Sequence, residues 1–296
     1  MAGPARYLDP AVLARLGSLD LKAKTVVEGV LSGLHRSPRR GFSVEFAEYR
    51  QYLPGDALST IDWKVYARSD RYVVKKFEAE TNLDCHLLLD ISGSMAYGSH
   101  AVTKREYASY LAASLAYLMH RQRDAVGLIA FDEAIVHRLP ASARAGALRA
   151  ILLALERMPA GARTNVAKPL GDLAMVLAKR GLVVVISDLL DDPEAVVRGL
   201  RQFRQRGTDV IVFHVLDPQE LRFRFDDAAR FRDVENARET FADPGQVRDA
   251  YLRAITSLVD TYRRELGGAG IDYHLLDTSL PLDLALVSYL NARSRS

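Results

Sequence analysis

The sequence predicts an α/β protein with a doubly wound, mostly parallel sheet and an N-terminal appendage of a helix and strands. From residue 83 onward, short apolar runs alternate with amphipathic stretches of helical spacing. Two of these runs, LVVVIS (182–187) and VIVFHVL (210–216), are apolar on both faces, as a strand covered by helices on each side requires. The chain has 296 residues, of which 49% are hydrophobic, enough for a large core.

The appendage is predicted to span residues 1–82. A helix is expected from Asp9, which can cap it, to about Leu34, because Pro10 suits the first turn and apolar residues recur at helical spacing. From Phe42 to Glu80 the pattern changes to short alternating pieces typical of strands. Turn signals separate these pieces at Pro54-Gly55-Asp56 and Arg68-Ser69-Asp70.

The second predicted domain spans residues 83–296 and carries the sheet. The pair VGLIAF and AIVHRL, joined by Asp132-Glu133, also suits a hairpin with one antiparallel strand on the sheet edge. A small β excursion is expected near residues 220–245, with FRF and RFRDV as its strands, before a helix over Gln246–Leu266. The five expected core strands are Asp84–Asp90, Ala125–Phe131, Leu182–Ser187, Val210–Leu216 and Ile271–Leu276.

Composition excludes several classes of protein. The net charge of +3 is far from the concentrated positive field that nucleic-acid or anionic-membrane binding needs. The single cysteine, Cys85, excludes an internal disulfide framework. No apolar stretch is long enough to span a bilayer, and no leader-like segment follows Met1. We therefore expect a cytoplasmic protein with no nucleic-acid partner and no membrane insertion.

An aspartate and two serines follow the first predicted core strand. In LLLDISGSMAYG (87–98), Asp90 ends the apolar run, and Ser92 and Ser94 follow at spacings of two. Ligands of doubly wound sheets bind at the carboxyl ends of the strands. Alternate residues of an extended loop project to one side, so the three side chains can converge, with Gly93 giving the bend. Three converging oxygens suggest a hard cation.

Two further strand or loop ends supply oxygen-bearing side chains. Thr164, in ARTNV, comes just before a predicted helix, and Asp188, in VVVISDLL, ends the most apolar strand. Mg2+ prefers six oxygens at about 2.1 Å and takes one or two carboxylates with hydroxyls, waters or partner groups. The sequence therefore predicts a Mg2+ site, with Mn2+ or Ca2+ as alternative ions, formed by Asp90, Ser92, Ser94, Thr164 and Asp188.

The DxSxS pattern also has a purely structural interpretation. Aspartate and serine side chains bond to nearby backbone amides and so cap turns. Taken alone, the pattern fits a capped turn as well as a metal loop. Thr164 and Asp188 at other strand or loop ends favour the metal site.

DISGSM, TN and the strand-terminal SD resemble the metal-ion-dependent adhesion site of von Willebrand factor A domains, which have a Rossmann-type α/β fold. The resemblance covers roughly residue 84 to the C-terminus. It implies that Ser92, Ser94 and Thr164 ligate the ion and that Asp90 and Asp188 hold it through water. It also implies that an acidic residue of a partner fills the last position.

Two positions depart from that pattern. Family members usually carry glycine beside the threonine and after the last aspartate, where this chain has Arg163 and Leu189. The loop shape is therefore expected to differ more than the set of ligands.

The appendage narrows the resemblance. EYRQYLPGDALSTIDWKVYAR, VKKFEAE and the DISGSM strand together resemble the domain of unknown function fifty-eight family, in a short form without membrane helices. The later DPQEL, FRDVEN and IDYHLLDTSLPL resemble the same family, so nearly the whole chain is covered. This resemblance implies an adaptor or co-chaperone that works with a MoxR-type AAA+ ATPase, or its client, in maturing or assembling other proteins.

Charged and aromatic residues of the appendage have two interpretations. They form either a surface for a protein partner or the interface that docks the appendage on the core. The candidate partner-binding residues are Arg50, Asp56, Trp63 and Arg68.

Catalysis is the rival class of function. A haloacid-dehalogenase-like phosphatase also places an aspartate, here Asp90, at the end of the first strand as a nucleophile beside Mg2+. Its second motif aspartate would fall at Ser92, and no positioned lysine is evident in the sequence. No GxxxxGK[ST] loop and no GxSxG elbow is present either. We therefore expect a non-enzymatic protein.

Overall fold

The computed structural model describes the chain over most of its length. The described residues are 9–35, 48–52, 65–66, 71–76, 84–159, 161, 165–177, 181–225, 229–232, 239–242 and 244–293. Of the predicted site residues, Thr164, Asp56, Trp63 and Arg68 lie outside these ranges. None of the described helices combines the length and apolarity needed to cross a bilayer.

A six-stranded sheet forms the centre of the α/β part, as predicted. Its strands are β3 (Asp84–Asp90), β4 (Ala125–Phe131), β5 (Ile135–Ser142), β6 (Gly181–Ser187), β7 (Asp209–Leu216) and β10 (Asp272–Asp277). They lie in the order β10-β7-β6-β3-β4-β5, and every neighbouring pair is parallel except β4 and β5. The hairpin interpretation with an antiparallel edge strand is therefore correct.

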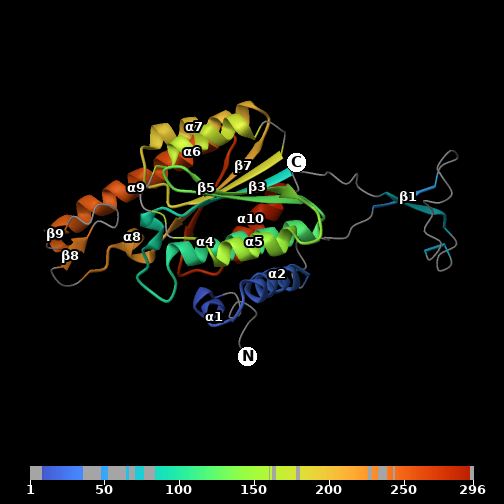
Figure 1. The fold of residues 1–296 in the computed structure, drawn as a ribbon, viewed down its shortest axis with the longest axis horizontal. Coiled ribbons are helices and arrows are strands. Elements are labelled where there is room, and N and C mark those ends of the chain that lie inside the picture. Colours follow the sequence, from blue (N-terminus) through green and yellow to red (C-terminus); the bar gives the residue numbers. More distant parts are fainter. Residues whose placement is uncertain are drawn as a thin grey trace. The chain divides into compact units, whose positions relative to one another are not determined.

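Helices cover both faces of this sheet (Figure 1). One face carries α6 (Ala167–Val176), α7 (Pro193–Gln205) and α9 (Pro244–Gly268). The other carries α4 (Lys104–Arg121), α5 (Ala147–Glu156) and α10 (Asp283–Arg293). Burial on both faces explains why the strands read as nearly continuous apolar runs.

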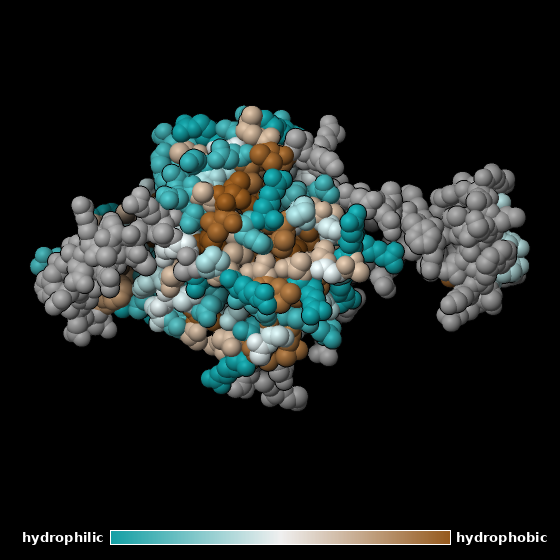
Figure 2. All heavy atoms as spheres, viewed as in Figure 1, coloured by the Kyte–Doolittle hydropathy of each residue, from teal (hydrophilic) through white to brown (hydrophobic). Residues whose placement is uncertain are grey.

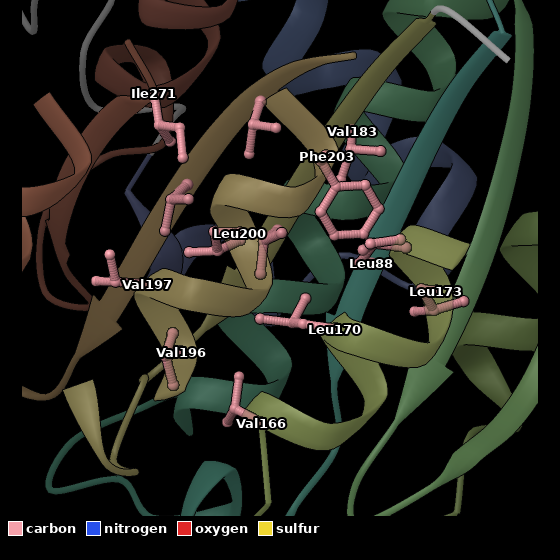
Figure 3. Close-up of a cluster of buried hydrophobic side chains, with 14 of the residues drawn as sticks. Leu88, Val166, Leu170, Leu173, Val183, Val196, Val197, Leu200, Phe203 and Ile271 are labelled. Atoms are coloured by element: carbon pink, nitrogen blue, oxygen red, sulfur yellow. The ribbon is translucent and has the colours of Figure 1, made fainter. Parts of the chain in front are cut away.

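A single apolar cluster joins the sheet to α6 and α7. Figure 3 shows Leu88 and Val183 of the sheet facing Leu170 of α6 and Leu200 and Phe203 of α7. Each of these five side chains is fully buried. Burial of a large apolar side chain contributes about 1.5–3 kcal/mol, so this cluster holds the ends of β3 and β6 in fixed positions.

The N-terminal helical segment forms two helices rather than the one expected. Helix α1 (Pro10–Ala14) begins at the Asp9 cap as predicted, and α2 (Leu19–His35) follows a break over residues 15–18. Gly17 weakens helix continuity there, and the Ser18 hydroxyl accepts a hydrogen bond from the amide of Leu21, 3.3 Å away, as a new N-terminus requires.

These helices belong to the α/β unit, so the expected appendage of residues 1–82 is too long. The chain divides into one unit of Met1–Leu31 with Leu83–Ser296 and another of Ser32–Asn82. The amide of Leu19 donates to Glu156 of α5, and the ammonium of Lys22 donates to the Tyr110 hydroxyl of α4 at 3.1 Å. The buried apolar residues of α2, among them Ala23, Val26 and Val27, lie on one face of the helix, as expected for an amphipathic helix that packs on a core.

In the unit Ser32–Asn82, β1 (Glu48–Gln51) pairs antiparallel with β2 (Val73–Lys76). The rings of Tyr66 and Tyr72 stack with centroids 4.4 Å apart. Two short strands thus lie in the region where the sequence predicts alternating strand pieces, and the expected piece FSVEF (42–46) lies outside the described residues.

The β excursion also exists, and one of its two expected strands, RFRDV (230–234), overlaps an observed strand. Helix α8 (Pro218–Arg222) precedes β8 (Ala229–Arg232), which pairs antiparallel with β9 (Glu239–Ala242). FRF does not form a strand, because Phe223 ends α8 in the left-handed conformation and its ring packs against Tyr251 of α9.

The edge strand β5 exposes large apolar side chains. Figure 2 shows apolar surface crossing the middle of the α/β unit between hydrophilic regions. Among the described residues, exposed large apolar side chains include Ile135 and Val136 of β5 and Met175 and Val176 of α6. Two register shifts and Pro140 interrupt the ladder of β5, which limits pairing of this edge with another chain.

Candidate metal centre

Asp90 and Asp188 lie on the two sides of the topological switch point of the sheet. The chain leaves β3 to form β4 on one side and later returns to form β6 on the other. Asp90 is the last residue of β3, and Asp188 directly follows β6. Ligands of doubly wound sheets bind in the crevice at such a point.

The carboxylate of Asp90 is fully buried, and both of its oxygens accept hydrogen bonds. The amide of Ser92 donates to Oδ1 at 2.9 Å, and the hydroxyl of Ser187 donates to Oδ2 at 2.5 Å. Burial and the neighbouring charge of Asp188 raise the pKa of Asp90 to about 7, although these hydrogen bonds oppose the rise. The protein therefore holds this carboxylate where a nearby positive charge would stabilise it.

The two predicted serines lie together. Their hydroxyl oxygens are 3.1 Å apart, and a short helical turn, η3 (Gly93–Ala96), carries Ser94 back toward Ser92. Adjacent ligands of an octahedral Mg2+ ion at about 2.1 Å lie about 3.0 Å apart. The spacing of the hydroxyls therefore fits two neighbouring positions around one ion, as well as a hydrogen bond between them.

A strained backbone follows β6. Leu189 has φ of 49°, in the left-handed region that disfavours a side chain, yet its own side chain is fully buried. Its amide donates to the Ser187 hydroxyl and its carbonyl accepts from the Tyr262 hydroxyl, each at 2.9 Å. Members of the family that the site resembles usually carry glycine at this position. Leu189 adopts the glycine-like conformation without being a glycine.

Thr164 lies outside the described residues, but both of its flanks are anchored to the site loops. The amide of Gly161 donates to the carbonyl of Ile91, 2.8 Å away, directly after β3. The amides of Val166 and Ala167 donate to one carboxylate oxygen of Asp191, which lies in the loop after β6. A Cβ at Gly161 would lie 2.5 Å from the Ile91 carbonyl oxygen, so the close approach requires glycine.

A buried lysine lies at this site, although no positioned lysine is evident in the sequence. The ammonium of Lys104, the first residue of α4, donates to Asp188 Oδ2 at 2.8 Å and to Glu220 Oε1 at 2.6 Å. Both Lys104 and Asp188 are fully buried, and Glu220 is partly buried. Burial lowers the pKa of Lys104, but the two carboxylates outweigh this and raise it above its usual value.

Sequence reasoning missed Lys104 and Glu220 for different reasons. Glu220 lies in DPQEL, where Asp217 and Glu220 form a capping box that is recognisable as a helix start but not as part of a site. No local pattern marks Lys104, whose partners lie 84 and 116 positions away in the chain. Long-range ion pairs leave no periodic signal.

Asp217 ties the loop after η3 to the end of β7. The amide and the hydroxyl of Ser99 donate to its two carboxylate oxygens, at 2.8 and 2.6 Å. The imidazole of His100 lies 3.5 Å from the same carboxylate and 3.1 Å from the carbonyl of Thr278. Figure 1 shows α8 beside this loop at one end of the sheet. The Asp217 carboxylate, directly after β7, therefore holds the loop that follows the two serines.

Comparison with protein families decides the classification. The family model described as "Protein of unknown function DUF58" matches residues 48–258. The chain belongs to the DUF58 family. The match includes the strand that ends at Asp90 and the helix that carries Glu220.

The relatives of this DUF58 chain are themselves described as uncharacterized. The Mycobacterium tuberculosis protein Rv1480 (strain H37Rv) is 30% identical over 292 residues, which cover 97% of this chain and 91% of the relative. Mb1516 of Mycobacterium bovis matches to the same extent. Among solved structures, the conserved hypothetical protein BatB from Bacteroides thetaiotaomicron aligns over 72% of this chain and 100% of its own, with a TM-score of 0.51 and 15% identity. This likeness shows a shared α/β fold.

The donor set of the DUF58 chain suits a hard cation better than a soft one. Among the described residues, no group of three or more His, Cys, Asp or Glu side chains is placed to hold a metal. The converging groups are instead one aspartate and two hydroxyls, with a second aspartate across the crevice. Hard oxygen donors of this kind favour Mg2+, Mn2+ or Ca2+ over Zn2+ or copper.

The predicted partner-binding residues of the appendage stay a prediction. The backbone of Arg50 lies in β1, paired with Val74 of β2. Asp56, Trp63 and Arg68 lie outside the described residues.

Proposed function

We propose that this DUF58 protein is a non-enzymatic, metal-dependent protein-binding module, similar in its site to von Willebrand factor A domains. The cation would be held by Ser92, Ser94 and Thr164, with Asp90 and Asp188 around it. The observation that carries the proposal is the pair of hydroxyls 3.1 Å apart beside a buried carboxylate at the switch point of the sheet.

Each residue group has a distinct part in the proposed site. Asp90 supplies a negative charge that burial makes costly unless a cation balances it. The hydroxyls of Ser92 and Ser94 supply neutral oxygens, which leave the ion electrophilic enough to accept an external carboxylate. Mg2+ is the proposed ion, with Mn2+ and Ca2+ as alternatives, and its chemistry is to bridge the protein to an acidic side chain of a partner.

The proposed partner is a MoxR-type AAA+ ATPase or a client protein that such an ATPase matures or assembles. This assignment comes from the resemblance of the appendage and site motifs to the family. The protein is proposed to act in the cytoplasm as an adaptor or co-chaperone. Arg50, Asp56, Trp63 and Arg68 are proposed as a second, metal-independent contact, and Trp63→Ala should weaken association without lowering the melting temperature.

A direct binding measurement tests the proposal. The purified protein is immobilised and exposed to the purified MoxR-type ATPase of the same organism, with Mg2+ or with chelator. Wild type should bind more tightly with Mg2+ than with chelator, and Asp90→Asn should show only the weaker, metal-independent binding in both conditions. Equal affinity of wild type in both conditions, matched by Asp90→Asn, would assign recognition to another surface.

The alternative function is a magnesium-dependent phosphatase with Asp90 as nucleophile. Asp90 suits that role poorly, because it is fully buried and both of its carboxylate oxygens accept hydrogen bonds. Lys104 is also fully buried and contacts Asp188 and Glu220 rather than open space where a phosphate could bind. Turnover of phosphoester substrates that disappears in Asp90→Asn would favour the enzyme.

A further inference from the structure

Lys104 lies at the N-terminus of a helix, where a positively charged side chain lowers the stability of the helix. It is the first residue of α4, directly after the Thr103 cap. The N-terminus of a helix carries a partial positive charge, so a lysine there is repelled rather than stabilised. Other groups in contact with this fully buried ammonium must therefore stabilise its charge.

Its contacts are two carboxylates at the candidate metal centre. Lys104 Nζ lies 2.8 Å from Asp188 Oδ2 and 2.6 Å from Glu220 Oε1, and it lies 6.0 Å from the centre of the Tyr97 ring. No part of the side chain reaches solvent, so it cannot contact a partner or a substrate directly. Any influence of Lys104 on function passes through the carboxylates beside it.

The two aspartates of the site therefore differ in how far a positive charge already balances their own charge. Asp188 already has a cation on one oxygen, while its other oxygen accepts a long hydrogen bond, 3.3 Å, from the amide of Leu190. Asp90 forms no ion pair with any residue of the described part of the chain, and its hydrogen bonds come from a neutral amide and a neutral hydroxyl. A divalent ion would meet an uncompensated charge at Asp90 and a compensated one at Asp188.

We infer that Lys104 is an internal cation that competes with the divalent ion for Asp188, lowers the affinity of the site for Mg2+, and confines the ion to the side of Asp90, Ser92 and Ser94. The inference rests on the proposed function and adds to it the residue that sets metal affinity. An ion held weakly in this way depends more on the partner's carboxylate, so metal and partner bind cooperatively.

A matched pair of variants isolates the charge of Lys104. Glu220→Gln keeps the Lys104–Asp188 pair and removes the second carboxylate. Lys104→Met with Glu220→Gln removes the ammonium as well, without leaving Glu220 buried and unpaired. The two proteins differ only at residue 104, and circular dichroism and thermal unfolding in chelator establish that both are folded.

Isothermal titration of the full-length proteins with Mg2+ and with Mn2+ gives the dissociation constants. The double variant should bind Mg2+ at least about tenfold more tightly than Glu220→Gln, because a like charge a few ångströms from the ion is removed from a buried site. Lys104→Met alone should show the same gain relative to wild type. Equal affinities within each pair would overturn the inference.

The same titration separates the inference from the proposed function. If wild type binds Mg2+ as tightly as the Lys104 variants, only the role of Lys104 is wrong. If the Lys104 variants bind Mg2+ and wild type does not at millimolar concentration, the role of Lys104 is supported and the magnesium dependence of wild type is overturned. If none of the proteins binds either ion, both are overturned.

Discussion

At the scale of single residues, Asp90 combines a functional position with an unfavourable environment. Burial and the charge of Asp188 raise the pKa of its carboxyl to about 7, far above the value of 3.8 for the exposed group. The unfolded chain therefore loses this proton at lower pH than the folded protein does. Without metal, ionisation of Asp90 lowers the stability of the folded state as the pH rises from about 4 to about 7, and the loss is complete above pH 7.

Asp90→Asn should therefore change stability and metal binding in opposite directions. In chelator at pH 8, the free energy of unfolding should be about 1–3 kcal/mol higher than in wild type, because a buried charge is removed. Affinity for Mg2+ should fall by about a hundredfold or more. Urea denaturation and calorimetric titration measure the two quantities, and a variant that is less stable and still binds Mg2+ would contradict the assignment.

His214 provides a second pH-dependent contribution at the residue scale. Burial, with a smaller contribution from the charge of Lys104, lowers the pKa of this imidazole to about 4, although Asp188 opposes the shift. Its Nδ1 lies 2.7 Å from the hydroxyl of Tyr273. The unfolded chain takes up a proton below about pH 6.5 that the folded protein does not, so stability is lost as the pH falls from about 6.5 to about 4.

The variant His214→Gln tests this contribution. Between pH 7 and pH 4, the unfolding free energy of wild type should fall by up to about 3 kcal/mol more than that of the variant. Parallel urea titrations of both proteins across this range give the difference. An identical pH dependence would mean that the folded protein takes up this proton as readily as the unfolded chain does, which contradicts a lowered pKa.

At the scale of elements, Gly161 makes a close backbone contact between the segment that joins α5 to α6 and the loop after β3. An alanine at residue 161 would place its Cβ 2.5 Å from the carbonyl oxygen of Ile91, so one of the two loops must move. Gly161→Ala should therefore lower stability by about 1–3 kcal/mol and weaken Mg2+ binding severalfold.

Gly171 of α6 offers the matched control for this variant. A Cβ added there meets no atom within 4 Å, and the residue lies inside a helix. Gly171→Ala should leave Mg2+ binding unchanged and raise stability by about 0.5–1 kcal/mol. Equal effects of the two substitutions on metal binding would show that the Gly161–Ile91 contact does not shape the site.

The elements that sequence predicts well are those with a local signal. The five core strands carry continuous apolar runs, and their observed bounds differ from the expected ones by at most one residue. The break between α1 and α2 and the strand β9 were missed, and FRF was wrongly assigned to a strand, since single glycines and short polar strands give weak patterns. Asp90 was placed correctly at the end of β3 and Asp188 directly after β6, whereas no sequence pattern marks Lys104, because its partners are distant in sequence.

At the scale of the whole molecule, the two units should be separable in function. Apolar residues of α1 and α2, among them Leu13, Val26 and Val27, are buried within the α/β unit. Replacing residues 36–82 by a flexible linker of roughly 20 residues should leave a folded protein with unchanged Mg2+ affinity.

Removing residues 1–31 should have the opposite result. The face of α4 and α5 that α2 covers would be exposed, and the protein should aggregate or lose several kcal/mol of stability. Thermal unfolding and light scattering compare the two deletions. If the protein lacking residues 36–82 is the unstable one, the division into these two units is wrong.

The location of the cation tests the central claim most directly. Crystals of the full-length protein grown with Mn2+ give an anomalous difference map that marks the ion without reference to its ligands. We expect one strong peak about 2.2 Å from the hydroxyl oxygens of Ser92 and Ser94, on the Asp90 side of the crevice, and no such peak in Asp90→Asn. A map with no peak at these hydroxyls, in crystals containing millimolar Mn2+, would contradict the metal site on which the proposed function depends.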